Sequence, residues 1–298
     1  MIDVCLVGTG GMMPLPDRFL TSLYVLTNGE GLLIDCGEGT QTAIRSAHLR
    51  FKCIKTLLLT HYHADHVSGL PGFLLTLGNE ARTEPLHIYG PIGLKRVIAA
   101  CRVIVPELPF EIIAHELPED EESEFEAGSL QVTAYPANHG MPCLSYVMRL
   151  PRPGKFDVAK AQSKHIPIKY WSMLQNGVTV DGFVPEDVLG APRKGLKLVY
   201  STDTRPIEGT VRLGKGADLM VLEGMFGEPE KRERAIVTHH ETMQEAAELA
   251  RQANASALWL THYSPANPHP EEYCDIIKQI FPNTVIATDG MCTTLNFE

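Results

Sequence analysis

Three histidines and one aspartate lie within six residues of this chain, in the segment HYHADH at positions 61–66. The segment follows residues 54–59, an apolar run typical of a β-strand, so we expect it to form the loop past the carboxyl end of a strand. Imidazole nitrogens and carboxylate oxygens suit zinc and similar divalent ions. The sequence therefore predicts a metal site here, and the alternative is a polar surface loop that happens to contain histidines.

Length and composition describe a globular chain. Its 298 residues, 44% of them apolar, are enough for one large domain or two ordinary ones. No apolar run is long enough to span a bilayer, and the first residues show no basic segment before an apolar stretch, so we expect a cytoplasmic protein without a membrane partner. The seven cysteines are scattered and form no CxxC pair. This pattern predicts reduced thiols rather than disulfides.

Charge is unevenly distributed. The net charge of −10 gives no general attraction to nucleic acid, and we expect no DNA partner. Between Arg149 and Lys197, however, nine basic residues stand against four acidic ones. Within this region the Pro-rich segment 151–195 has weak periodicity and is too long for an ordinary loop, which predicts an inserted arm. From charge alone, a solvated surface and a functional surface remain equally open for this segment.

The remainder alternates strand and helix patterns. Strands are predicted near 2–7, 22–27, 31–35, 57–59, 86–89, 110–114, 130–135, 144–149, 196–201, 218–222, 257–261 and 285–287. Helices are predicted near 41–48, 69–77, 91–105, 241–253 and 270–281, with one more between the strands at 196–201 and 218–222. The acidic run 116–126 reads as solvated surface. The alternation fits two sheets packed face to face with helices outside.

Further metal-ligating candidates follow other apolar strands. His139 follows the strand ending near residue 135, Asp203 follows the strand 196–201, and His262 follows the strand 257–261. A lone histidine in such a place is usually structural. Three candidates, each just after an apolar strand, instead favour one shared site with the 61–66 loop.

The HxHxDH loop after an apolar strand resembles the signature of the metallo-beta-lactamase superfamily, whose members are mostly two-metal hydrolases. The resemblance implies an α/β fold, a four-layer αβ/βα sandwich, here as a single domain (1–298) with the arm inserted at about 151–195. It also implies that His61, His63 and His139 hold one metal ion. Asp65, His66 and His262 would hold the other, and Asp203 would bridge both.

Other segments resemble the ribonuclease Z family, the tRNA 3′-processing branch of this superfamily. They are GEGTQ at 37–41, PCLSY at 142–146, DTRP at 203–206 and THYS at 261–264. The segment 153–190 resembles the inserted arm with which bacterial members grip tRNA. The loop PLPDRF at 14–19 keeps the proline and arginine of a family loop that senses the 3′ end of tRNA, but not its lysine and asparagine.

The resemblance implies a metal-dependent phosphodiesterase that removes 3′ trailers from precursor tRNA with a metal-bridging hydroxide. Two zinc ions per subunit are expected, with manganese or iron as alternatives, and the family implies a homodimer. Asp65, Glu223 and His240 would be catalytic, with Glu223 and His240 forming a pair that protonates the leaving oxygen. Contacts to substrate are expected from Arg18, Thr242, Arg152, Lys155, Lys160 and Lys164.

Two alternatives remain open at this point. The first is a hydrolase of the same fold that acts on a smaller phosphodiester or another ester with the same pair of metals. The second is a metal-bound RNA-binding protein with little catalytic activity. Removal of the arm separates the first alternative from tRNA processing, and an Asp65→Ala variant tests the second.

Overall fold

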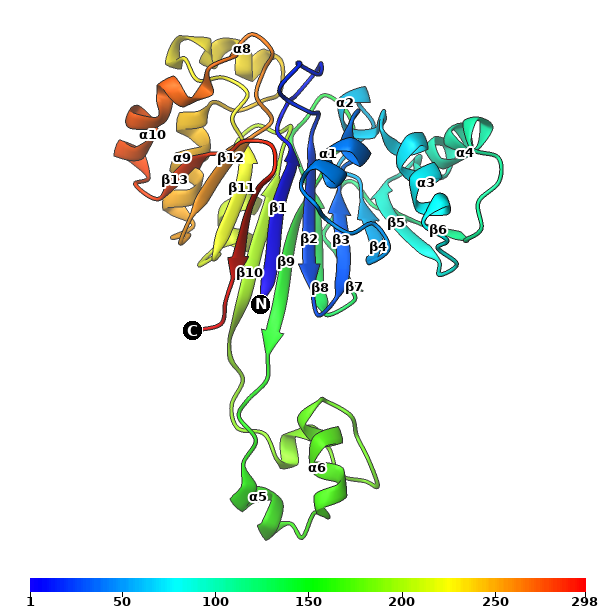
Figure 1. Ribbon diagram of the computed structural model, residues 1–298. Coiled ribbons are helices and arrows are strands. Elements are labelled where there is room, and N and C mark those ends of the chain that lie inside the picture. The colour runs from blue at the N-terminus through cyan, green and yellow to red at the C-terminus, as the bar shows by residue number, and fades with distance from the viewer.

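The computed structural model describes residues 1–298 and contains two seven-stranded mixed sheets (Figure 1). The first sheet has the order β14 (Met291–Leu295), β1 (Ile2–Gly8), β2 (Ser22–Thr27), β3 (Glu30–Ile34), β4 (Ile54–Leu58), β5 (Leu86–Pro91), β6 (Ile112–Leu117). The second has the order β13 (Thr284–Ile286), β12 (Leu258–Thr261), β11 (Leu219–Glu223), β10 (Arg193–Ser201), β9 (Leu144–Arg152), β8 (Leu130–Pro136), β7 (Ser123–Ala127).

Alternating side chains place each strand between two apolar layers. In β1, Ile2, Val4 and Leu6 face the second sheet and join the core between the sheets, while Cys5 and Val7 face outward. This is the period of two that a strand imposes on its side chains. The core between the sheets contains 24 buried residues, and each outer face carries a further large apolar cluster.

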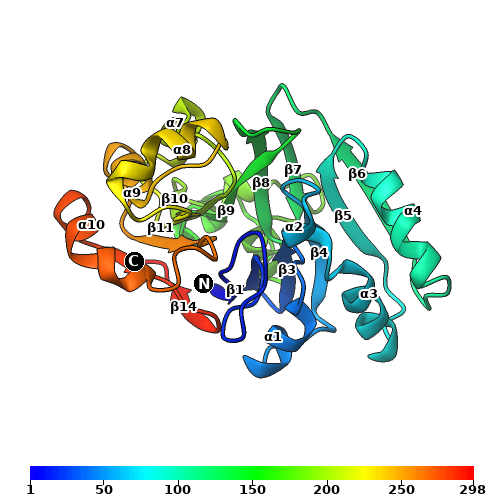
Figure 2. The ribbon, with the colours of Figure 1, turned by 90° about the horizontal axis from the view of Figure 1, so that it is seen from above.

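Helices cover both outer faces, which completes the predicted four-layer αβ/βα sandwich (Figure 2). The first sheet carries α1 (Thr40–Ser46), α3 (Leu70–Asn79) and α4 (Leu94–Ile104). The second carries α7 (Glu208–Gly214), α9 (Met243–Gln252) and α10 (Cys274–Ile280). Shorter helices are α2 (Ala64–Val67), α8 (Arg232–Val237) and the 3-10 turns η1 (Pro185–Asp187), η2 (Pro229–Lys231) and η3 (Pro270–Tyr273). No helix has both the length and the apolar character required to cross a membrane.

The structure differs from the predicted secondary structure in three places. The acidic run is not merely solvated surface, because its end forms β7, where Phe125 and Ala127 turn inward between exposed glutamates. The helix α8 was missed, since its six residues are too few to show a period. The strand predicted near 285–287 is present as β13, but the strand β14 after it was missed, and β14 pairs with β1 at the other end of the chain.

The inserted arm has a small core of its own. The strands β9 and β10 run beyond the sheet as a thin stem, and the arm below them holds α5 (Val158–Ser163) and α6 (Ile168–Gln175) (Figure 1). Ala161, Ile166, Leu174 and Val188 are buried together there. A cluster this small gives little periodicity in the sequence.

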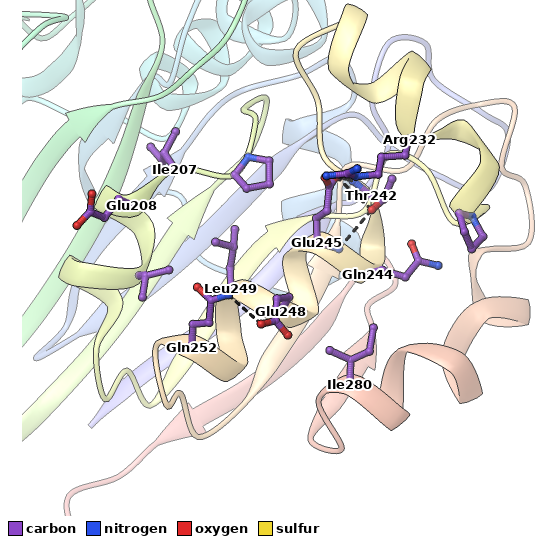
Figure 3. Close-up of a pocket in the computed structure, with 13 residues that line it drawn as sticks. Ile207, Glu208, Arg232, Thr242, Gln244, Glu245, Glu248, Leu249, Gln252 and Ile280 are labelled. Carbon is purple, nitrogen blue, oxygen red and sulfur yellow. Dashed lines mark hydrogen bonds and ion pairs between the residues drawn. The ribbon is translucent and has the colours of Figure 1, made fainter.

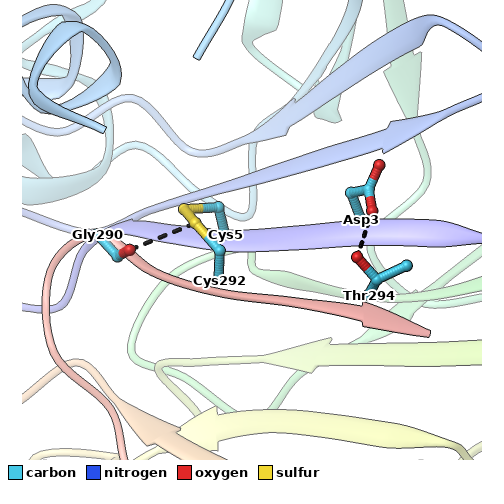
Figure 4. Close-up of a disulfide and its surroundings, with 5 residues drawn as sticks. All are labelled: Asp3, Cys5, Gly290, Cys292 and Thr294. Carbon is cyan, nitrogen blue, oxygen red and sulfur yellow. Dashed lines mark hydrogen bonds between the residues drawn. A yellow bond between two sulfur atoms is a disulfide. The ribbon is translucent and has the colours of Figure 1, made fainter. Parts of the chain in front are cut away.

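A disulfide joins Cys5 to Cys292, contrary to the prediction that all cysteines are reduced (Figure 4). The two residues lie directly opposite each other on the antiparallel strands β1 and β14. They are 287 positions apart, so sequence spacing gave no sign of the pairing. The other five cysteines are free.

Loss of this disulfide should destabilise the fold. Because the bond closes a very long loop and restricts the unfolded chain, Cys292→Ser should lower the free energy of unfolding by about 2–4 kcal/mol. Urea unfolding without reductant measures this difference, with Cys274→Ser as the control because Cys274 is free. Equal midpoints for Cys292→Ser and wild type would contradict the pairing.

Candidate metal centre

The strands bring the predicted ligands to one end of the sandwich. The 61–66 loop follows β4 and continues into α2, while His139, Asp203 and His262 follow β8, β10 and β12. Asp203 and His262 have φ angles of +53° and +56°, in the left-handed region that non-glycine residues seldom adopt. Such strain is typical of positions held in place for function.

The first set of ligand atoms comes from both sheets. Nε2 of His61 and Nε2 of His139 lie 2.9 Å and 3.2 Å from Nδ1 of His63. Oδ2 of Asp203 lies 3.7 Å from Nε2 of His61. The four ligand atoms all lie within 4.8 Å of one another, as a shared metal ion requires.

The second set lies on the other side of Asp203. Nε2 of His262 is 3.4 Å from Oδ2 of Asp65, and Nε2 of His66 is 3.2 Å from Nε2 of His262. Oδ1 of Asp203 lies 3.0 Å from His262 and 3.2 Å from His66. The Asp203 carboxylate thus turns one oxygen toward each set. The seven residues assembled here are those that the sequence predicted.

Two features of this structure fit a divalent metal. Oδ1 of Asp203 is buried and accepts no hydrogen bond, although two imidazole nitrogens lie close to it. Burial and the neighbouring His66 hold the pKa of His61 well below its usual range, which leaves the ring neutral, as a ligand must be. Together with the imidazole and carboxylate donors, these features make the cluster a divalent metal-binding site.

Asp35, which sequence reasoning missed, supports His66 from behind. Its fully buried carboxylate accepts hydrogen bonds from Nδ1 of His66 at 2.8 Å and from the backbone N–H of Thr60 at 2.8 Å. A carboxylate behind a ligating histidine fixes the ring and its tautomer. The signal was available, because Asp35 directly follows the apolar strand β3, as Asp203 follows β10.

Glu223 and His240 form the predicted pair. Nδ1 of His240 donates to Oε2 of Glu223 at 2.9 Å, and the backbone N–H of Thr204 donates to Oε1 of Glu223 at 2.7 Å. Burial disfavours the charged form of His240, but the Glu223 carboxylate outweighs it and raises the pKa of His240 to about 9. His240 is therefore protonated at neutral pH, with Nε2 free to donate.

Arg205 fixes the backbone of this pair. Its guanidinium donates to the backbone carbonyl of His240 and binds the Glu245 carboxylate through both Nη atoms, at 3.0 and 2.6 Å. Glu241, which follows His240 in the sequence, is fully buried, and neither of its carboxylate oxygens has a hydrogen-bond partner. Burial and the nearby Glu223 raise the pKa of Glu241 well above its usual range, so it is held as the neutral acid.

A cavity of about 400 Å³ opens onto the metal ligands. Besides ligands and His240, it is lined by residues that sequence reasoning did not select, namely Met12, Ala64, Met225, Phe226, Arg234, Thr238 and Ser264. Arg234 is the one arginine of this lining, which contains no lysine. It lies on α8, which the sequence did not predict, so no pattern could place it here.

A larger cavity, of about 710 Å³, lies elsewhere, beside α7 and α9 on the outer face (Figure 3). Its carboxylates are largely engaged, since Glu245 binds Arg205 and Arg232, and Glu248 binds Arg251. Thr242 lines this cavity, and its hydroxyl accepts the backbone N–H of Glu245 as the N-cap of α9. Its predicted contact with substrate stays a prediction.

The other predicted substrate contacts also lie outside the metal cavity. Arg18 donates to the backbone carbonyls of Asn267 and Pro268, at 3.3 and 3.1 Å, and lies over the ring of Tyr263. The remaining four predicted contacts belong to the stem and the arm: Arg152, Lys155, Lys160 and Lys164. The structure brings none of them near the metal ligands, and their contact with substrate stays a prediction.

Replacement of Asp35 should weaken metal binding. Asp35→Asn keeps the side-chain volume but removes the negative charge behind His66, so we expect a 10- to 100-fold loss of metal affinity. Chelator competition followed by metal analysis measures it. Asp3→Asn, an aspartate on β1 that bonds Thr294, is the control. Equal affinities for the two variants would contradict the role of Asp35.

Comparison with known proteins identifies the family. Residues 2–100 match a family model described as Anti-Pycsar protein Apyc1, and residues 150–263 match one described as a beta-lactamase superfamily domain. The short form of human tRNase Z has a similar structure, with a TM-score of 0.73 and 25% identity over 99% of this chain and all of the human chain.

Curated relatives match over the full length. The ribonuclease Z of Lachnoclostridium phytofermentans is 48% identical and that of Agathobacter rectalis 47% identical, each over 100% of this chain and 99% of the relative. The matched region includes both the sandwich and the arm. The chain belongs to the ribonuclease Z family of the metallo-beta-lactamase superfamily.

Proposed function

We propose that this protein is a metal-dependent endoribonuclease that removes 3′ trailers from precursor tRNA. The observation that carries the proposal is the complete site, in which seven His and Asp ligands converge beside the Glu223–His240 pair. Full-length relatives named ribonuclease Z support it. The smaller-substrate alternative has the same centre, so the test must use RNA.

The ligand arrangement supports two ions per subunit, one on each side of Asp203. His61, His63 and His139 would hold the first ion, and Asp65, His66 and His262 the second. Zinc suits these nitrogen and oxygen donors, with manganese or iron as alternatives. Bound ions would supply Lewis-acid stabilisation of the phosphate and a nucleophile at neutral pH.

The chain's own residues handle the proton of the leaving group. His240 is held by Glu223 at Nδ1, so its Nε2–H can be donated to the 3′-oxygen that departs from the tRNA. Thr204 and Arg205 hold this pair in place through Glu223 and the His240 carbonyl. Asp65 is buried and accepts the backbone N–H of Met12 at 2.6 Å, which fixes its orientation toward His262.

The rest of the chain would bind the RNA. We propose that it acts as one catalytic domain with an arm at about 151–195 that contacts the tRNA, and that two copies form a homodimer. Phosphate contacts of this kind weaken steeply as salt rises.

Removal of a metal ligand tests the proposal directly. Wild type with zinc or manganese should cut a precursor tRNA once, at the 3′ side of the discriminator nucleotide, and His63→Ala should abolish the cut. Gel analysis of a labelled precursor measures both. His87→Ala is the matched control, because His87 lies at β5, away from the ligands.

The outcome also separates the alternatives. Wild type that turns over a small chromogenic phosphodiester but leaves precursor tRNA intact would favour the smaller-substrate hydrolase. Wild type that binds tRNA but cuts neither substrate would favour an RNA-binding protein.

Replacement of Glu223 tests the general acid. Glu223→Gln removes the charge that raises the pKa of His240, so His240 should lose its proton at lower pH. We expect tRNA cleavage to slow by about 10²- to 10⁴-fold and the alkaline limb of the pH profile to shift to lower pH. Single-turnover rates between pH 6 and 10 measure both effects. A slowed enzyme with an unshifted alkaline limb would contradict the pairing.

A further inference from the structure

A further cavity, lined by many charged side chains, lies where the arm leaves the body. We call this region the neck, defined as residues 149–152 of β9 and 193–197 of β10, at the upper end of the stem in Figure 1. The cavity has a volume of about 350 Å³. Its lining includes five cations, Arg149, Arg152, Arg193, Lys194 and Lys197, and a single acid, Asp218.

The strand register sets like charges against each other in the neck. Arg193 lies directly opposite Arg152, and Lys197 lies directly opposite Arg149. Like charges at opposed positions of an antiparallel pair destabilise it. Two such pairs in one short stretch destabilise the fold unless something binds them. They also stand out in a chain whose net charge is −10.

Most of these cations donate hydrogen bonds to uncharged groups. Arg149 donates to the Thr133 hydroxyl at 2.7 Å, and Lys197 donates to the backbone carbonyl of Lys215 at 2.7 Å. Arg193 likewise donates to the backbone carbonyl of Pro153. Only Lys194 forms ion pairs, at 3.2 Å with Asp218 and 3.9 Å with Glu298. The neck therefore keeps an excess of positive charge.

The arm itself shows the opposite arrangement. Lys164 is paired with the Asp187 carboxylate, and Lys160 donates to the backbone carbonyls of Leu189 and Glu186 at 3.1 and 3.3 Å. These lysines hold the arm's own fold together. Between residues 153 and 192 four lysines are matched by four acidic residues, whereas the neck strands carry five cations and no acid. The positive charge of the segment 149–197 is thus least neutralised at the neck.

We infer that the neck is a binding site for RNA phosphates, which rests on the proposed function. Guanidinium and ammonium groups bind phosphate oxygens with charge-assisted hydrogen bonds, and a bound phosphate would relieve both like-charge pairs. From Lys197 to Ser201 the strand β10 covers about 13 Å, at roughly 3.3 Å per residue, and Asp203 lies two residues further on. An RNA helix of several base pairs spans that distance, so one RNA can contact both the neck and the metal site.

Neutralisation of one opposed pair tests this site. Arg149→Gln/Lys197→Gln removes two charges but keeps long polar side chains, and Arg45→Gln/Arg251→Gln removes two exposed charges elsewhere as the control. Binding of precursor tRNA to the metal-loaded protein is measured from 50 to 200 mM salt. The slope of log K against log salt should decrease by about two for the neck variant. Its deficit relative to the control should therefore shrink by about ten-fold across this range.

Two further readouts guard against a damaged fold. Turnover of bis(p-nitrophenyl) phosphate reports on the metal centre, and thermal unfolding reports on stability. Because a repulsion is removed, the unfolding midpoint of the neck variant without RNA should not fall below that of the control. If the double variant unfolds, Lys197→Gln alone should still decrease the slope by about one.

Each outcome decides something. Equal salt slopes for the neck and control variants would overturn the neck site. Wild type that binds the precursor in a salt-dependent way without cutting it would contradict the proposed function but not the neck. Wild type without salt-dependent binding would overturn both. If tripolyphosphate stabilises wild type but not the neck variant, while both bind RNA equally, the site takes small polyphosphates instead.

Discussion

The Asp203 carboxylate lies between two sets of metal ligands, and the rest of the structure is arranged to place it there. Four ligands come from the first sheet, in the loop and short helix after β4, and His139 and His262 come from the second. Neither sheet holds a complete site. Close packing of the two sheets through their 24-residue core is therefore a condition of metal binding, since a shift of either sheet separates the ligands within each set.

This arrangement has costs for the stability of the fold. Asp203 and His262 hold left-handed backbone angles, Oδ1 of Asp203 is buried without a hydrogen bond, and Glu241 is buried as a neutral acid. Each feature destabilises the fold. A divalent ion bound by Asp203 and the imidazoles would offset the cost of the unpaired Oδ1. Metal binding and folding stability should therefore be coupled in this protein.

Strand positions and the residues that gather at the metal site could be predicted from the sequence, because the candidate ligands lie just after apolar runs. The predictions failed where pairing across the chain decides the structure. Cys5 meets Cys292 only because β14 closes on β1. Arg234 reaches the metal cavity from a helix too short to show periodicity. The charges of the arm were visible, but which of them remain free depended on contacts such as Lys164 with Asp187.

A comparison of the two sheets explains the positions of Asp35 and of the arm. Along the orders β14-β1-β2-β3-β4-β5-β6 and β7-β8-β9-β10-β11-β12-β13, each sheet has three antiparallel pairings followed by three parallel ones. In this correspondence β3 matches β10, and each is followed by a buried aspartate with φ near +55°, Asp35 and Asp203. One supports a ligand and the other is a ligand. The tight turn between β2 and β3, at Asn28 and Gly29, matches the place where the arm is inserted between β9 and β10. That turn lies at the end of the strands away from the metal, where an insertion can bind substrate without disturbing the ligands.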